Sequence, residues 1–180
     1  MTLPEDQQTP EYLVNEGMKA YQSGDYSTAI HLFLSAHSGF LSSENPLSAA
    51  EAANNLSVCY LKAGNAQEAL EAAAGTDEVF AQAGDLRRQA MALGNQAVAL
   101  ESLGKLGQAV DKYEESSKLL KQTGDLDNRA IVLQSLSELQ MKMGHQLDAM
   151  ATMRIALLNK KKQSLLDRLL QKLLKIPFGS

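Results

Sequence analysis

Apolar residues recur along the chain at helical spacing, and the whole pattern repeats every 40 residues. Glycines stand 40 positions apart, at Gly24, Gly64, Gly104 and Gly144. An alanine follows each of them five positions later, at Ala29, Ala69, Ala109 and Ala149. Small residues also recur seven positions before and twelve positions after each glycine. A fixed period of this length predicts a stack of similar units that bury one continuous core between neighbours.

Each unit is predicted to contain two helices with the glycine at the turn between them. Ala, Leu, Gln, Glu and Met dominate on both sides of the glycine, and these residues favour helices over strands. Glycine suits the left-handed position after a helix, and Asp25 is a good N-cap for the next one. Cap and turn residues at Thr9-Pro10, Asn45-Pro46, Gly84-Asp85 and Gly124-Asp125 separate the units. The sequence therefore predicts eight repeat helices, in units of about 10–44, 45–84, 85–124 and 125–158.

The first unit carries the residues of a known repeat. Small and aromatic residues follow one another in a fixed order at Gly17, Ala20, Tyr21, Gly24-Asp25-Tyr26, Ala29-Ile30, Phe33 and Ala36. This order resembles the tetratricopeptide repeat, over roughly residues 11–158, and later units keep the small residues while losing aromatics. The 40-residue unit is similar to the long repeats of kinesin light chains and G-protein-signalling modulators. The resemblance implies an all-α fold, a right-handed α-solenoid of four helical hairpins.

Charge is distributed unevenly, which separates a body from a tail. Residues 1–158 carry 11 Lys and Arg against 20 Asp and Glu, whereas residues 159–180 carry six against one. An acidic repeat body argues against nucleic acid as a partner. No apolar run approaches the length of a membrane span and no signal segment is evident, so we expect a cytoplasmic protein. The single cysteine, Cys59, is expected to be a buried apolar residue and excludes disulfide or zinc chemistry within one chain.

Catalytic and metal-binding patterns are missing from the sequence. The three histidines, His31, His37 and His145, have no carboxylate or cysteine at metal-ligand spacing. Phosphate loops, nucleophile elbows and dinucleotide fingerprints are missing too, because the glycines follow the repeat and do not cluster. We therefore expect a protein that is not an enzyme and that holds no cofactor or metal.

The tetratricopeptide resemblance implies that the first helix of each unit lines a concave groove. Asparagines recur there nine positions before the glycine, at Asn15, Asn55 and Asn95, with Ser135 in the fourth unit. Their amides could bind the backbone of an extended peptide, or they could hold neighbouring helices together, and the sequence leaves both open. The resemblance places the following residues on or near the same surface: Val14, Met18, Glu51, Asn54, Val58, Leu61, Lys62, Met91, Val98, Glu101, Gln134, Glu138, Met141 and Lys142.

One binding mode of the family is disfavoured by the residues present. Some members hold a C-terminal carboxylate with a clamp of Lys, Asn and Arg side chains. Val14 and Met18 stand where Lys and Asn would be required, and Met91 and Asn95 where Lys and Arg would be required. Only Asn55 matches, so a bound carboxylate would lose most of its charged partners.

The segment after the fourth unit is basic and rich in leucine. Three lysines are followed by leucine pairs every four residues, at Leu165, Leu166, Leu169, Leu170, Leu173 and Leu174. This spacing predicts a basic amphipathic helix over part of residues 159–180. Such a helix could cap the solenoid, self-associate, or lie on an anionic membrane. Residues 1–9 are expected to form a flexible N-terminus.

Taken together, these patterns favour an adaptor that binds a peptide segment of a partner protein in the concave groove. The alternative is an oligomerising or membrane-associated scaffold that acts through the basic leucine-rich segment. The first hypothesis requires a protein or peptide ligand. The second requires that the basic segment associates with a second copy of itself or contacts a membrane.

Overall fold

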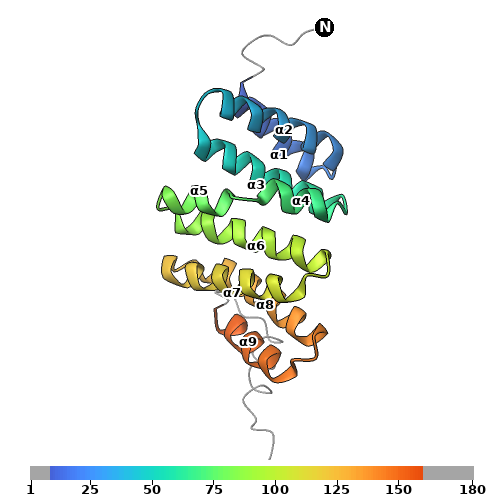
Figure 1. Ribbon diagram of the computed structural model, residues 1–180, viewed down its shortest axis with the longest axis vertical. Coiled ribbons are helices and arrows are strands. Elements are labelled where there is room, and N and C mark those ends of the chain that lie inside the picture. The colour runs from blue at the N-terminus through green and yellow to red at the C-terminus, as the bar shows by residue number, and fades with distance from the viewer. Residues whose placement is uncertain (1–8, 160–180) are drawn as a thin grey trace, which may run out of the picture.

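The computed structural model describes residues 9–159, and every regular element in this range is an α-helix (Figure 1). The helices are α1 (Pro10–Gln22), α2 (Tyr26–Ser42), α3 (Pro46–Lys62), α4 (Ala66–Ala73), α5 (Thr76–Gln82), α6 (Leu86–Ser102), α7 (Leu106–Thr123), α8 (Leu126–Lys142) and α9 (Gln146–Asn159). The expected all-α solenoid is confirmed. The expectations for the N-terminal residues and for the capping helix concern residues 1–8 and 160–180, which lie outside the described residues.

Successive helices pack against one another in a single stack (Figure 1). The hairpin of α1 and α2 lies at one end of the stack and α9 at the other. The first helices of the four units are α1, α3, α6 and α8. The second helices are α2, the pair α4 and α5, α7 and α9. The molecule thus presents two kinds of surface, one made by first helices and one by second helices.

Local signals define most helix ends as the sequence predicts. The repeat glycines all adopt positive φ, as Gly24 does at 82°, and the backbone N–H of Asp25 then donates to the Ala20 carbonyl at 2.9 Å. This arrangement satisfies carbonyl groups at the end of α1. The Asp25 carboxylate accepts from the backbone N–H of Thr28 at 3.0 Å and so caps α2. One turn departs from the pattern, because Glu44 has a φ of 54° where the later units have Gly84 and Gly124.

Small residues let the helices approach closely in the core. A Cβ added at Gly17 would lie 3.1–3.2 Å from the ring of Phe33, so the aromatic side chain packs directly on the glycine. Cys59 is 1% exposed, as the sequence predicts for a buried apolar residue. Burial raises the pKa of its thiol to about 11, so the thiol is protonated at neutral pH.

The second helix of the second unit differs from the others, because it is broken into α4 and α5 (Figure 1). Gly75 adopts a φ of 73° and turns the chain. The Ala73 carbonyl freed by the break accepts hydrogen bonds from Thr76 Oγ1 at 2.8 Å and from Gln96 Nε2 at 2.9 Å. Gln96 Nε2 also lies 2.7 Å from Asp77 Oδ1. A polar residue of α6 therefore stabilises the broken ends.

Candidate functional site

The outward faces of α1, α3, α6 and α8 form what we term the first-helix surface. Large apolar side chains are exposed along it, although exposure costs free energy unless something covers them. They are Met18, Met91, Val98, Ile131 and Met141. The sequence placed all of these except Ile131 on this surface. Ile131 is 63% exposed and occupies the same repeat position as Met91, which is the signal that could have identified it.

A cavity of about 190 Å³ opens on this surface between α6 and α8. We term it the Gly94 cavity. Met91, Asn95 and Val98 line it from α6, and Ile131 and Ser135 line it from α8. Tyr113 of α7, which is 2% exposed, contributes to the lining from beneath. The cavity therefore joins apolar walls to an amide and a hydroxyl, a combination that suits a peptide side chain and its backbone.

Gly94 lines this cavity, whereas the other units carry a side chain at the equivalent position, Val14, Asn54 or Gln134. A Cβ built on Gly94 would lie 3.7 Å from Ser116 Oγ and 3.9 Å from Val132 Cγ2, which are ordinary contact distances. Core packing does not require a glycine at this point, and a glycine inside a helix is destabilising relative to alanine. The effect of the glycine is to leave space on the surface.

A second, smaller cavity of about 80 Å³ lies between α1 and α3, and we term it the Met18 cavity. Met18, Asn55 and Val58 line it together with the aromatic rings of Tyr21 and Phe33. The two cavities resemble each other, because each is lined by an asparagine that stands nine positions before a repeat glycine, Asn95 or Asn55. Both of these recesses can receive an apolar side chain, and both lie on the same row of helices.

The predicted asparagine ladder is interrupted. Asn95 Nδ2 donates to Asn54 Oδ1 at 2.9 Å, so this amide pair links α6 to α3. Asn15 is exposed on α1. The half-buried amide of Asn55 makes no hydrogen bond within residues 9–159. Helix-to-helix bonding, the structural role that the sequence left open, therefore applies to Asn95, whereas Asn55 keeps its polar atoms for other partners.

Most charged residues of the first-helix surface are paired with one another. Lys142 Nζ lies 2.6 Å from Glu101 Oε1, and this hydrogen bond raises the pKa of the lysine. Glu101 Oε2 also accepts from Tyr113 Oη at 3.2 Å. Burial, followed by the neighbouring Glu101 charge, raises the pKa of Tyr113, so the hydroxyl stays protonated. Lys142 and Glu101 thus form an ion pair with each other on this surface.

A further ion pair and a hydrogen bond involve charged residues of this surface. Arg88 lies 3.6 Å from Glu51 across α6 and α3, and Gln134 donates to Glu138 at 3.0 Å along α8. Lys62 is exposed on α3 and makes no ion pair with the described residues. The surface is therefore close to neutral over most of its length, with apolar recesses between the ion pairs.

Neither a metal centre nor a membrane span emerges from the described part of the chain. Between Thr9 and Asn159 no group of three or more His, Cys, Asp and Glu side chains could hold a metal ion. No helix in that range is both long enough and apolar enough to cross a bilayer.

The stacked hairpins define a tetratricopeptide-like α-solenoid. Two crystal structures of nearly identical TPR-like repeats, assigned to a kinesin light chain of Podosopora anserina, share this fold. One superposes with a TM-score of 0.55 at 14% identity and covers 96% of both chains. The other has a TM-score of 0.53 at 15% identity and covers 97% of this chain and 96% of its own. No family model matches the sequence, and no curated protein matches it.

Proposed function

We propose that the protein is a non-enzymatic adaptor that binds an apolar, largely uncharged peptide segment of a partner protein on the first-helix surface. In tetratricopeptide-like solenoids this surface is the concave one. The observation that carries the proposal is the Gly94 cavity, because a helix-interior glycine that packing does not require keeps a recess open between exposed apolar side chains.

The internal ion pairs support an uncharged ligand. Glu101 and Lys142 satisfy each other, as do Glu51 and Arg88, so a charged ligand would have to compete with existing partners. Apolar side chains need no such exchange. Methionines at positions 18, 91 and 141 add adaptable contact area around the recesses.

Asn55 is assigned the role of fixing the peptide backbone, because its amide can both donate and accept. Asn95, held by Asn54, lies at the edge of the Gly94 cavity in a fixed orientation. We expect such a groove to bind a short segment with a Kd near 1 μM, which corresponds to about −8 kcal/mol.

A peptide selection tests the proposal. Random peptides displayed on phage are selected against the full chain, and binding of the purified peptides is measured by fluorescence anisotropy. We expect the selected peptides to be rich in apolar residues and to lose at least about tenfold in affinity with Val98→Asp, since a charge would enter the Gly94 cavity. The Asn55→Ala, Asn95→Ala double variant should also weaken binding.

The matched control is Leu147→Asp, which places the same charge on an exposed leucine of the second helix α9. Circular dichroism verifies that each variant keeps its helix content. Peptides that bind Val98→Asp as tightly as the wild type, or that lose affinity only with Leu147→Asp, would contradict the proposal.

A further inference from the structure

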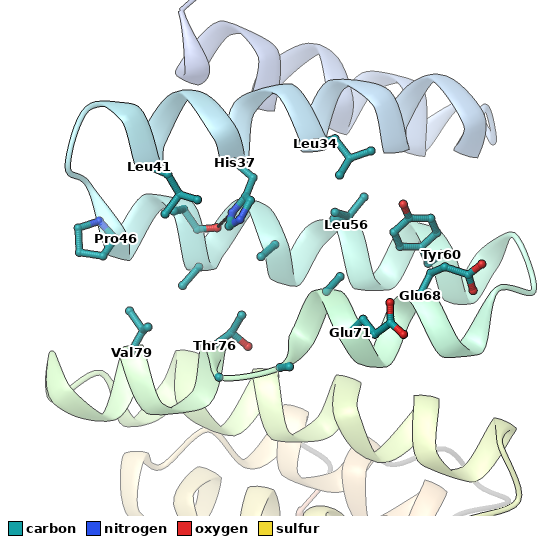
Figure 2. A pocket seen from close by; sticks show the side chains of 16 residues that line it. Leu34, His37, Leu41, Pro46, Leu56, Tyr60, Glu68, Glu71, Thr76 and Val79 are labelled. Carbon is teal, nitrogen blue, oxygen red and sulfur yellow. Dashed lines mark hydrogen bonds between the residues drawn. The ribbon is translucent and has the colours of Figure 1, made fainter.

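The second-helix surface carries a cavity of about 480 Å³ between α2 and the broken pair α4 and α5, which is larger than the Gly94 and Met18 cavities (Figure 2). We term it the Ala53 cavity. Leu34 and Leu41 of α2 form one wall and Val79 of α5 forms part of the other (Figure 2). Both leucines are exposed, by 40% and 55%. Glu68 and Glu71 lie beside Tyr60 at one end (Figure 2).

Two departures from the repeat pattern meet in this cavity. Ala53, in its floor, occupies a position that is leucine in every other unit, at Leu13, Leu93 and Leu133. Gly75 replaces Ser35, Glu115 and Ile155 of the other units and breaks the second helix beside the cavity. Gln96, where the second and fourth units have Leu56 and Leu136, caps that break. Ala53 and Gly75 therefore distinguish this recess from the corresponding positions of the other units.

Charge indicates what the recess receives. Residues 26–82, which form α2 to α5, contain six acidic residues and a single basic one, Lys62. Residues 106–158, which form the equivalent region of the last two units, contain seven acidic and six basic residues. In the lining of the Ala53 cavity the charged residues are Glu68 and Glu71, with no Lys or Arg among the lining residues. A complementary ligand combines apolar side chains with positive charge.

The chain's own residues 160–176 have this composition. They carry three lysines at the start, three further basic residues, and leucine pairs every four residues. We infer that residues 160–176 of one copy bind in the Ala53 cavity of a second copy. The leucines contact Leu34, Leu41 and Val79, and the lysines face Glu68 and Glu71. A second copy is the donor because α9, which precedes this segment, lies at the end of the stack opposite to α2 (Figure 1).

Such a contact joins two different surfaces, so it propagates from head to tail. Sedimentation analysis of the full chain should show a weight-average mass that rises past that of a dimer with concentration. High salt should weaken the association, because it screens the charges.

Two pocket variants locate the receptor surface. Ala53→Leu restores the residue of the other units and fills the cavity floor, and Leu34→Lys with Leu41→Lys places positive charge on exposed wall positions. Each should raise the apparent Kd of self-association at least about tenfold. The control pair Leu126→Lys with Leu147→Lys makes the same changes at exposed positions outside the cavity and should leave association unchanged.

Mixing a tail variant with a pocket variant tests whether the tail of one copy binds the cavity of another. A tail variant, Leu165→Ser with Leu169→Ser, should be monomeric alone, as should the Leu34→Lys, Leu41→Lys variant. An equimolar mixture should form one-to-one heterodimers, because one variant keeps the tail and the other keeps the cavity. A monomeric wild-type chain at all concentrations would overturn the inference, and so would pocket variants that associate as the wild type does. Equal binding of wild type and pocket variants to phosphatidylserine vesicles, without self-association, would assign the tail to membranes instead.

Discussion

Replacing Gly94 by alanine should stabilise the fold while weakening peptide binding. The new Cβ would lie 3.7 Å from Ser116 Oγ and 3.9 Å from Val132 Cγ2, so it creates no clash. Alanine inside a helix is more stable than glycine by about 0.5–1 kcal/mol. For a chain of this size, such a gain raises Tm by about 1–4 °C.

The same methyl group occupies the Gly94 cavity. Loss of space for one methylene of a ligand costs about 0.8 kcal/mol, which corresponds to about a fourfold rise in Kd. Stability is measured by urea unfolding followed by circular dichroism, and binding by anisotropy with a selected peptide. Stability and affinity should therefore change in opposite directions.

Gly107→Ala is the matched control, because a Cβ at Gly107 in the first turn of α7 would meet no atom within 4 Å. This variant should leave the stability equal or slightly higher and should leave binding unchanged. A Gly94→Ala protein that is less stable than the wild type would refute the reasoning, since it would show that packing needs the glycine. Equal loss of affinity in both variants would remove the Gly94 cavity from the binding site.

Three further predictions concern the fold. Glu44→Gly should raise the free energy of unfolding by about 1 kcal/mol in a urea titration, because a non-glycine residue at a φ of 54° is strained; a loss of stability would contradict this. Gln96→Leu should lower it by about 1–3 kcal/mol, because the side chain is 5% exposed and its bonds to the Ala73 carbonyl and Asp77 would be lost; an unchanged urea midpoint would show that the break needs no such support. Hydrogen bonds from Arg87 and then from Asn128 hold the pKa of Asp125 below its ordinary value, so its stabilisation is complete above about pH 4 and is lost as the pH falls through the lower folded-state pKa. Asp125→Asn should therefore reduce the acid dependence of unfolding, and an identical pH profile would count against this role.

The repeat period and the helix ends follow from the sequence alone. The turn at Gly24 and the cap at Asp25 depend on the conformational preferences of adjacent residues, so their letters are sufficient to predict them. The small residues that recur with the period likewise indicate where helices approach, and Gly17 beneath Phe33 bears this out. The tetratricopeptide resemblance of the sequence also implied that the first helix of each unit lines the binding groove.

Only the tertiary structure decided which groups on those helices are available. Asn95 is bonded to Asn54, 41 residues away along the chain, and Lys142 to Glu101 over the same separation. The sequence alone does not predict which side chains of neighbouring units form hydrogen bonds, because the distance between them depends on how the units stack.

The break at Gly75 could not be predicted from the local sequence either. A glycine inside a helix costs only about 1 kcal/mol, so the local sequence favours a continuous helix almost as well as a broken one. The broken form exists because Gln96, from a helix further along the chain, satisfies the carbonyl that the break exposes. Local backbone preferences thus set the repeat and its turns, whereas contacts between units, which depend on long-range packing, set the positions of the cavities.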